Sequence, residues 1–315
     1  QTLRRLNRMH EALKSYTNAV DLDPKYGWAW NGRGLTLSAL NRHEEALKSF
    51  RAATESGEQD AWYWYNYGDE LVTLNRFAES LPVLDKALSL NPRHAESWAK
   101  RGQSLRRLNR HADALAAYDE ALAVNPHYAW AWNGRGLALE NLGRREEALA
   151  SYERSIEEDP RVIWYYTNQI DVLLDMGRKG EAMIVSERAA NMMPRNAVAW
   201  ARKGQVQRRL SNYEGALESY LKALDLDSTY AWAWNGKGLA LAGLSRWDEA
   251  ITAYEQAVRY NMNDLWFWNN YGEALMAAKD YKKAVEAYMQ AAAIDPRHEV
   301  TRQRLKQARD LLNGS

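Results

Sequence analysis

The chain has 315 residues, of which 46% are hydrophobic and 26% are charged, and its 42 basic and 41 acidic residues give a net charge of +1. This balance excludes a global attraction to nucleic acid or to an anionic membrane, so binding of that kind would need a local patch. The absence of cysteine excludes disulfides, thiolate metal sites and a cysteine nucleophile. No apolar run reaches the length of a membrane span, so no membrane association is expected. These totals do not assign a compartment, although the cytoplasm is favoured.

A repeated pattern runs along the whole chain. The stretch from Tyr26 to Phe50 returns at Tyr128 to Tyr152 and again at Tyr230 to Tyr254, each copy 102 residues after the last. Self-similarity over the full length argues for one elongated repeat domain rather than two ordinary domains. Within the 102-residue period a glycine recurs every 34 residues, with Ile170 where one glycine is missing: Gly34, Gly68, Gly102, Gly136, Gly204, Gly238 and Gly272.

In chain order, residues 1–26 are expected to form the back part of a repeat. Because Gln1 aligns with Gln103 and Gln205 in the middle of a repeat, we expect the chain to be a piece of a longer protein. Residues 299–315 are expected to end the array with a solvating helix, in which Leu305, Leu311 and Leu312 make the apolar contacts. Between these ends lie eight predicted repeats of 34 residues: 27–60, 61–94, 95–128, 129–162, 163–196, 197–230, 231–264 and 265–298.

Each repeat is predicted to fold as two antiparallel helices. Its first half carries small or apolar residues at positions one, three, four, eight and eleven, and these spacings lie on one helical face. A break follows at residues that favour helix ends, namely Asn41, Asn75, Asn109, Gly143, Gly177, Ser211 and Ser245. The second half stops before Pro24, Pro92, Pro126, Pro160, Pro194 and Pro296. A lone helix pair cannot bury its apolar stripe, so the repeats must stack.

The fixed positions resemble those of the tetratricopeptide repeat. Positions four, eight, twenty, twenty-four and thirty-two carry Trp132, Gly136, Ala148, Tyr152 and Pro160, and Ser155 departs from the expected alanine at position twenty-seven. The resemblance covers essentially the whole chain and implies an all-α fold, a right-handed superhelical α-solenoid of antiparallel helix pairs. The leucine that usually precedes the recurrent glycine is missing, which indicates that the surface carries different side chains from those usual in the family. Its place is taken by Arg33, Tyr67, Arg101, Arg135, Gln169, Lys203, Lys237 and Tyr271.

The repeat register sorts the tryptophans into two sets. Position four holds Trp30, Trp64, Trp98, Trp132, Trp200, Trp234 and Trp268, with Tyr166 in the remaining repeat, and these rings are expected in the core. Position two holds Trp28, Trp62, Trp130, Trp164, Trp232 and Trp266. By the resemblance, position two lines the concave surface of the superhelix, so these rings are expected to meet a ligand. The alternative is packing between repeats, since Tyr26, Tyr128 and Tyr230 could stack on their neighbouring indoles.

The 102-residue period divides the repeats into three kinds. The first kind carries Trp, Asn and Leu at positions two, five and nine, as in Trp28, Asn31 and Leu35, then Trp130, Asn133 and Leu137, then Trp232, Asn235 and Leu239. The second kind carries a tryptophan with an acid at position nine, as in Trp62 with Asp69, Trp164 with Asp171, and Trp266 with Glu273. The third kind carries glutamine and two arginines, as in Gln1 with Arg4 and Arg5, Gln103 with Arg106 and Arg107, and Gln205 with Arg208 and Arg209.

By the resemblance these side chains face the groove. We call the groove-facing side chains of one repeat a station, so the groove would alternate two aromatic stations with one cationic station. Such alternation suits an extended peptide that offers apolar side chains and intermittent carboxylates, because tryptophan contributes contact area and arginine holds a carboxylate through two hydrogen bonds. An alternative of equal weight is that the arginines have no binding role and form a solvated face that was copied when a three-repeat block was duplicated. Repetition alone does not show whether the 102-residue period reflects a ligand.

A terminal-carboxylate clamp, known in family members that bind chaperone tails, is matched only in part. Asn66, Asn168 and Asn270 precede Lys100, Arg202 and Arg304 at position six, and these pairs could grip a ligand backbone or carboxylate. However, Asn31 and Leu35 stand where the clamp requires lysine and asparagine. The clamp is therefore not expected in this chain.

No catalytic residue, metal or cofactor is assigned. The segment Asn31 to Gly34 lies inside a predicted helix, so it is not a phosphate loop. Glycine at Gly32, Gly134 and Gly236 lowers helix stability by about 1 kcal/mol each relative to alanine. We expect that the missing side chain makes room for an indole ring or a ligand backbone. The six histidines show no metal-ligand spacing.

The leading functional prediction is a noncatalytic scaffold that binds a peptide or a protein surface. The second is a sensor or substrate-recruiting arm of a larger multidomain enzyme or signalling ATPase. Single-stranded nucleic-acid binding is a weaker alternative, because Asp69, Asp171 and Glu273 lie close to the tryptophans. Self-assembly through stacked ends is disfavoured by the polar last helix.

Overall fold

The computed structural model describes residues 2–57 and 59–314, and the side chain of Arg5 lies outside the described part. Regular structure in these residues is α-helical, which confirms the all-α prediction. The helices are α1 (Thr2–Arg5), α2 (Met9–Leu22), α3 (Gly27–Ala39), α4 (His43–Glu55), α5 (Ala61–Thr73), α6 (Phe77–Leu90), α7 (Ala95–Arg107), α8 (His111–Val124), α9 (Ala129–Asn141), α10 (Arg145–Glu158), α11 (Ile163–Asp175), α12 (Lys179–Met192), α13 (Ala197–Arg209), α14 (Tyr213–Leu226), α15 (Ala231–Gly243), α16 (Trp247–Tyr260), α17 (Leu265–Ala277), α18 (Tyr281–Ile294) and α19 (Glu299–Gly314).

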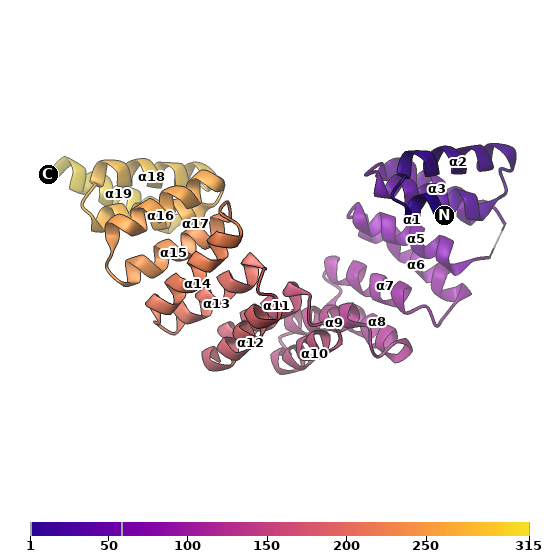
Figure 1. Ribbon diagram of the computed structural model, residues 1–315, viewed down its shortest axis with the longest axis horizontal. Coiled ribbons are helices and arrows are strands. Elements are labelled where there is room, and N and C mark those ends of the chain that lie inside the picture. The colour runs from indigo at the N-terminus through magenta and orange to yellow at the C-terminus, as the bar shows by residue number, and fades with distance from the viewer. Residues whose placement is uncertain (1, 58, 315) are drawn as a thin grey trace. The chain divides into compact units, whose positions relative to one another are not determined.

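The helices pack into two compact units, Gln1–Asp159 and Pro160–Ser315. In each unit consecutive helices lie side by side in chain order (Figure 1). An odd-numbered helix from α3 to α17 packs against the even-numbered helix that follows it. Within a unit it also packs against the next odd-numbered helix, as α3 does against α5 and α15 against α17. Each unit is therefore a stack of helix pairs in which the odd-numbered helices share one side.

The two helices of a pair are joined by a tight turn with one residue in the left-handed conformation. These residues have φ between 57° and 75°, and they are Asn41, Asn75, Asn109, Gly143, Gly177, Ser211, Ser245 and Lys279. After α3, the amide of Arg42 donates to the carbonyl of Leu37 and that of Asn41 to Ser38, which is a Schellman motif. The sequence located seven of these turns, and it missed Lys279 because lysine does not favour this conformation.

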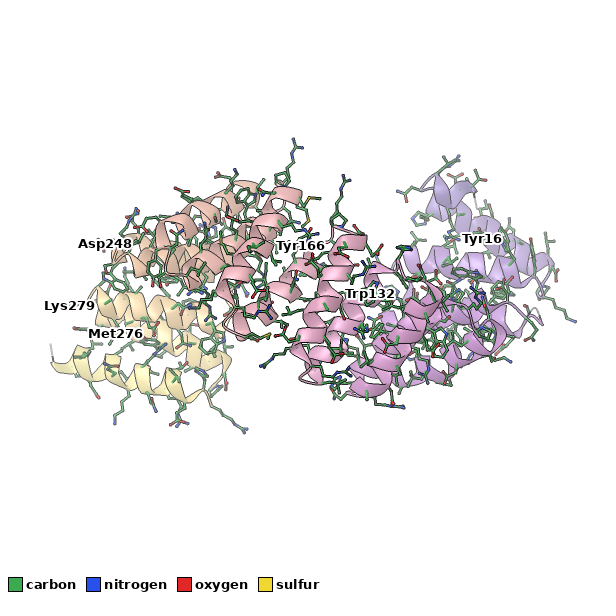
Figure 2. The ribbon with its side chains drawn as sticks, turned by 90° about the horizontal axis from the view of Figure 1, so that it is seen from below. Tyr16, Trp132, Tyr166, Asp248, Met276 and Lys279 are labelled. Carbon is green, nitrogen blue, oxygen red and sulfur yellow. The ribbon has the colours of Figure 1, made fainter. Side chains whose placement is uncertain are left out.

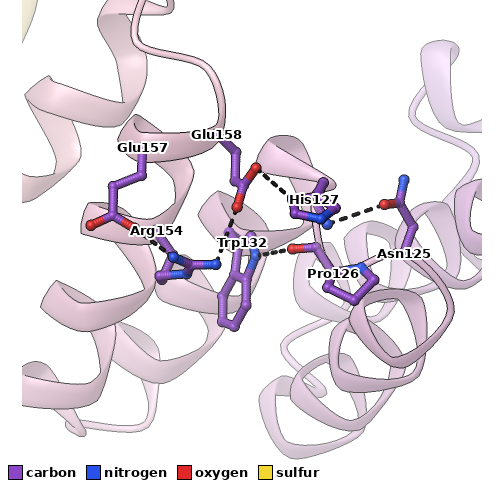
Figure 3. A network of polar contacts seen from close by, with 7 residues as sticks. All are labelled: Asn125, Pro126, His127, Trp132, Arg154, Glu157 and Glu158. Atoms are coloured by element: carbon purple, nitrogen blue, oxygen red, sulfur yellow. Dashed lines mark hydrogen bonds and ion pairs between the residues drawn. The ribbon is translucent and has the colours of Figure 1, made fainter.

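The turn between successive pairs is held by the ring at position four. The indole Nε1 of Trp132 donates to the carbonyl of Pro126 over 2.8 Å (Figure 3). Arg154 lies 5.8 Å from the same ring and pairs with Glu157 and Glu158. Equivalent bonds to the carbonyl six residues earlier are made by Trp30, Trp98, Tyr166, Trp200, Trp234 and Trp268. These rings hold the junctions between repeats, but the expectation that all of them lie in the core is only partly met. Tyr166 is fully buried, whereas the position-four tryptophans are half-buried at the turns.

The core of the stack interlocks rings with glycines. Tyr118 of α8 is 1% exposed, and its ring would lie within 3.0 Å of a Cβ added at Gly134 in the next repeat. Its other neighbour is Gly102, where an added Cβ would lie 3.0 Å from the ring. Tyr16 fills the same space beside Gly32, and Tyr220 beside Gly236. The expectation that these glycines make room for an indole or a ligand backbone is wrong, because the ring they accommodate is a core tyrosine.

The last helix, α19, covers the end of the C-terminal unit. Its buried side chains are Thr301 and Ala308, and the Thr301 hydroxyl donates to Oδ1 of Asn269 over 3.0 Å. Leu305 packs against the cluster of α17 and α18, as expected. Leu311 and Leu312 were expected to make similar contacts, but both remain exposed.

Candidate functional site

The position-two tryptophans lie at the start of the odd-numbered helices and differ in exposure. Four of them are exposed, at 42% for Trp28, 49% for Trp62, 64% for Trp164 and 59% for Trp266. Trp130 and Trp232 are half-buried. Tryptophan is enriched at protein interfaces, and these rings recur at one repeat position, so they mark this side of the odd-numbered helices as the candidate site.

In the first-kind repeats each position-two indole lies between two tyrosines. The ring centroid of Trp28 is 5.7 Å from that of Tyr16 and 5.8 Å from that of Tyr26. The same arrangement surrounds Trp130 with Tyr118 and Tyr128, and Trp232 with Tyr220 and Tyr230. The packing anticipated as an alternative therefore exists, and at Trp28 it coexists with a substantial exposed area.

In two of the three second-kind repeats a histidine supports the indole from the turn that follows, and Asn196 takes its place in the third. His94 meets Trp62 edge-on at 4.4 Å between centroids, and His298 meets Trp266 at 5.3 Å. His94 is buried, and its Nδ1 accepts a hydrogen bond from the amide of Ser97 at the start of α7. Burial lowers the pKa of His94, although nearby Glu96 opposes that shift.

The acids at position nine are paired within the protein. The Nζ of Lys100 lies 2.7 Å from Oδ1 of Asp69, and Arg202 donates to both oxygens of Asp171 over 2.8 and 3.1 Å. Arg304 forms the corresponding ion pair with Glu273. Burial nevertheless raises the pKa of Asp171 against the opposing charge of Arg202. The sequence did not reveal this pairing, because it joins residues 31 positions apart whose contact depends on the stacking of repeats.

The position-six bases also cover the half-buried indoles. Lys100 lies 5.0 Å above the ring of Trp130, and Arg202 lies 5.5 Å from the ring of Trp232. A cation over an indole face is attracted by the quadrupole of the ring. The base thus joins the acid of one repeat to the tryptophan two repeats later, and its charge is partly satisfied before any ligand binds.

The asparagines of the site contact one another rather than the bases that follow them. Asn66 Nδ2 donates to Oδ1 of Asn31 over 2.8 Å, and Asn270 Nδ2 donates to Oδ1 of Asn235 over 2.9 Å. The equivalent residue of the middle block, Asn133, also has a partner. These bonds connect position five of a first-kind repeat with position six of the next repeat.

The arginines of the third-kind repeats separate into two groups. Arg4 lines a cavity with Trp28, and Arg106 and Arg208 lie beside the hydroxyls of Tyr118 and Tyr220. Burial raises the pKa of each of these two tyrosines to about 12, and the neighbouring arginine opposes the rise. Arg107 instead lies 5.2 Å from the ring of Phe77, and Arg209 is exposed. Gln1 and the side chain of Arg5 lie outside the described residues.

The cavity beside Arg4 brings two predicted stations together. It has a volume of about 210 Å³ and is lined by Arg4, Tyr16, Trp28, Asn31, Gly32 and Leu35. We call it the Arg4 pocket. Tyr16, labelled in Figure 2, belongs to α2 and is 5% exposed. The sequence placed the arginine and the tryptophan at separate stations, whereas the structure gives them one shared pocket.

A larger cavity lies away from these residues, between α16 and α18. Its volume is about 1020 Å³, and Trp268 and Tyr271 of α17 contribute to its lining. The hydroxyl of Tyr271 donates to Glu255 over 2.8 Å. In five other repeats position seven carries a base that lies over the position-four indole, as Arg33 does over Trp30 and Arg135 over Trp132, whereas Tyr67 and Gln169 take this place in the remaining two. Tyrosine at position seven is the sequence signal that could have indicated this cavity.

Within residues 2–57 and 59–314, no group of three or more metal-ligating side chains comes together. The same residues include no helix that is long and apolar enough to cross a membrane. The candidate site thus consists of indoles, amides, paired charges and arginines on the odd-numbered helices, together with tyrosines from the even-numbered helices and the turns.

Family models decide the relationship. A model described as tetratricopeptide repeat matches residues 1–61, 65–123, 99–162 and 235–299, and a second, described as TPR repeat, matches residues 204–245. The chain is a tetratricopeptide repeat protein. Members of this family generally act as scaffolds for protein–protein interaction. No curated protein sequence matches the chain.

Solved tetratricopeptide structures share the fold of this repeat protein. A chain from the crystal structure of the APC/C hetero-tetramer Cut9–Hcn1 aligns over 96% of this chain, with a TM-score of 0.59 and 18% identity. The protein spans 59% of the length of that chain. A tetratricopeptide repeat protein from Parabacteroides merdae aligns over 76% of this chain and 95% of its own, with a TM-score of 0.58 and 20% identity. A repeat protein from Cytophaga hutchinsonii aligns over 76% and 99%, with a TM-score of 0.57 and 18% identity.

Proposed function

We propose that this tetratricopeptide repeat protein is a noncatalytic scaffold that binds an extended peptide or a protein surface with its odd-numbered helices. The proposal rests on one observation, the exposure of Trp28, Trp62, Trp164 and Trp266 at the same repeat position. Burying one of these rings against a partner would remove a large apolar area from water, and tryptophan is enriched among residues that dominate binding energy.

The contrast with position four supports a role outside the scaffold. Position-four rings hold the turn before them through a hydrogen bond to a backbone carbonyl. Trp62 makes edge contacts with Tyr65 and His94 yet keeps half of its surface exposed. Such a ring is supported in one orientation and loses little side-chain entropy on binding.

A peptide-display selection tests the proposal. The immobilised protein is offered a library of random dodecapeptides, and the affinities of enriched peptides are measured for the wild type and for Trp62→Ala, Trp164→Ala and Trp266→Ala together. We expect the triple variant to lose at least about tenfold in affinity, because truncating a central aromatic contact costs about 2 kcal/mol or more.

The matched control removes exposed apolar side chains elsewhere, with Leu22→Ala and Ile184→Ala, since these residues are 87% and 67% exposed. Circular dichroism should show equal helicity in all variants. The assignment of the surface is rejected by a triple variant that binds as the wild type does, or by a control that loses as much affinity.

Two alternatives make different demands on the same surface. A role as the recruiting arm of a larger enzyme would use the same indoles, and the complete coding sequence would decide it. Single-stranded nucleic acid is the weaker alternative, because Lys100, Arg202 and Arg304 are already paired with acids. A salt titration with labelled oligonucleotides checks it, since phosphate binding must weaken steeply as salt rises.

A further inference from the structure

The Arg4 pocket forms where a third-kind repeat meets a first-kind repeat. Arg4 comes from α1, Tyr16 from α2, and Trp28, Asn31, Gly32 and Leu35 from α3. Its volume of about 210 Å³ is several times the ~30 Å³ that a water molecule occupies. It is below the ~300–1,000 Å³ of sites for drug-sized ligands. The pocket therefore suits a fragment such as one amino-acid side chain or one chain end.

The polar groups of the pocket are hydrogen-bond donors. Tyr16 is 5% exposed, and its hydroxyl has no hydrogen-bond partner among the described residues. Oδ1 of Asn31 already accepts from Asn66, which leaves Nδ2 of Asn31 as the donor. Arg4 adds a positive charge, and no acid lines the cavity. A buried hydroxyl without a partner is destabilising, so an acceptor supplied by a ligand would offset that cost.

The remaining walls are apolar. The faces of Trp28 and Leu35 can contact the methylene groups that lead to an anionic head. Gly32 permits the geometry, because a Cβ at this residue would lie within 3.0 Å of the Tyr16 ring. An anion on a short aliphatic stem thus matches the donors and the walls together.

The same residue types recur 102 and 204 positions later. The middle set is Arg106, Tyr118, Trp130, Asn133, Gly134 and Leu137, and the last set is Arg208, Tyr220, Trp232, Asn235, Gly236 and Leu239. The Nε atoms of Arg106 and Arg208 are buried and have no hydrogen-bond partner among the described residues. By contrast, the bases at position six are engaged by Asp69, Asp171 and Glu273. Helices α7 and α13 therefore each carry a base at position six that is paired with an acid and an arginine whose buried Nε still has a hydrogen bond to give.

We propose that the Arg4 pocket, and its counterparts at Arg106 and Arg208, bind a carboxylate carried by the peptide ligand. This rests on the proposed peptide-binding function and adds the chemistry of the ligand: one carboxylate for each 102-residue block, seated between an indole and an arginine. The carboxylate accepts from the guanidinium of the arginine, the hydroxyl of the tyrosine and the amide of the asparagine. It is carried by an acidic side chain or by the end of a chain.

The test uses three acetylated tripeptides as probes. Ala-Glu-Ala amide presents a side-chain carboxylate, Ala-Ala-Ala acid presents a terminal carboxylate, and Ala-Gln-Ala amide is the uncharged control. Each is titrated into the 15N-labelled protein while the side-chain amide signals of Asn31, Asn133 and Asn235 are followed. We expect saturable shifts with one or both carboxylate probes, and the effective probe identifies the source. Equal shifts with the glutamine probe, or none with either carboxylate, overturn the proposal.

Two variants separate binding from folding. Arg4→Gln should weaken carboxylate binding at Asn31 at least about tenfold, because a charge-assisted hydrogen bond contributes about 1.5–3 kcal/mol. Tyr16→Phe removes the hydroxyl and keeps the ring beside Gly32, so a smaller loss of about threefold to tenfold is expected. Arg51→Gln, on the exposed face of α4, should bind as the wild type does. An unchanged affinity in Arg4→Gln counts against the proposal.

The outcomes for the two proposals are distinguishable. Selected peptides that bind tightly without any acid support the peptide-binding function and contradict the carboxylate pocket. Saturable binding of a carboxylate probe at Asn31, with no peptide enriched by display, supports the pocket chemistry and contradicts the peptide-binding function.

Discussion

Gly134 lies at a helix position where alanine would ordinarily be favoured. Its backbone faces the ring of Tyr118, which is 1% exposed and is bounded on its other side by Gly102. The ring therefore has no room to move when a methyl group is added. Glycine at this position is required by packing between repeats, and a similar demand acts at Gly32 and Gly236.

Gly134→Ala should accordingly destabilise the protein. Overpacking a filled core costs about 1–3 kcal/mol, and alanine returns up to about 1 kcal/mol of helix propensity, so a net loss of up to about 2 kcal/mol is expected. The midpoint of urea unfolding measures it. The matched control is Gly180→Ala in α12, where nothing lies within 4 Å of an added Cβ and a small gain is expected. A stabilised Gly134→Ala variant would show that the ring can yield.

His94 makes the stability of the N-terminal unit depend on pH. Its Nδ1 must accept from Ser97 in the folded state, and burial holds the pKa below the ordinary value of 6.5. The unfolded chain therefore binds a proton more readily than the folded chain. The stabilising contribution is complete above pH 6.5 and is lost as the pH falls through the folded pKa.

His94→Asn should reduce this dependence, because Asn196 at the equivalent position accepts two amide hydrogen bonds without titrating. Hydrogen exchange in α7, followed from pH 8 to pH 5 with correction for intrinsic rates, measures the difference. The wild type should lose protection relative to the variant as the pH falls. Parallel curves for the two proteins would argue that His94 does not titrate between the two states.

For single residues, the sequence predicted whether a side chain belongs to the scaffold better than it predicted which atoms that side chain contacts. The rings at position four could be assigned to the scaffold because their spacing is regular. Their hydrogen bonds to Pro126 and its equivalents depend on the turn geometry, which the pattern does not contain. The role of Gly32 was misread for a similar reason, since the ring of Tyr16 reaches it from the neighbouring helix across the stack.

At the scale of the elements, ion pairs connect one odd-numbered helix with the next. Arg202 of α13 donates two hydrogen bonds to Asp171 of α11, and the exposed fractions of their side chains are 21% and 47%. This bidentate geometry restrains the guanidinium plane as well as its distance from the acid. The pair therefore contributes to the alignment of α11 with α13.

A double-mutant cycle should resolve this contribution. With Asp171→Asn and Arg202→Gln we expect a coupling energy of about 1 kcal/mol, the upper end for ion pairs in contact with water. The control cycle uses the more exposed pair of Arg246, the N-cap residue of α16, and Glu249 in the first turn of that helix. A smaller coupling is expected there, because the pair lies within one helix end and both side chains are about half exposed. Urea unfolding of the single and double variants provides the energies. Equal coupling energies in both cycles would contradict the proposal that the Asp171–Arg202 pair helps to align α11 with α13.

Helix ends were predictable because their causes are local. Asparagine, glycine and serine tolerate the left-handed conformation of the turns, and a proline restricts the residue before it. The pairing of Asp69 with Lys100 was not predictable, since it requires the rotation between successive repeats. The Arg4 pocket combines residues from three helices, so its composition could be predicted one residue at a time but its convergence could not.

At the scale of the whole molecule, the 102-residue period sets which repeats can be neighbours. Deleting residues 27–128 would join Tyr26 to Ala129 and recreate the contact of a third-kind repeat with a first-kind repeat. Deleting residues 95–128 would place Gly134 against Leu84 in place of Tyr118 and would remove Lys100, the partner of Asp69. The shorter deletion therefore disturbs the packing more than the longer one.

We expect the protein without residues 95–128 to unfold at a lower temperature than the protein without residues 27–128, although it retains 68 more residues. In repeat proteins, stability is approximately a sum over repeats and their nearest-neighbour interfaces, so one mismatched interface forms a weak point. Thermal unfolding followed by circular dichroism measures both midpoints. The reverse order would indicate that the repeats are interchangeable.

The hydrogen bond from the position-four ring to the preceding turn has an evolutionary consequence. The acceptor is a backbone carbonyl, so it survives any change of side chain, as Ser228 and Met262 demonstrate where other turns have proline. A substitution in one of these turns therefore leaves the hydrogen bond between the ring and the turn intact. An array built this way can diversify its turns one copy at a time, acquiring new contacts at its edge while the spacing of its repeats is inherited unchanged.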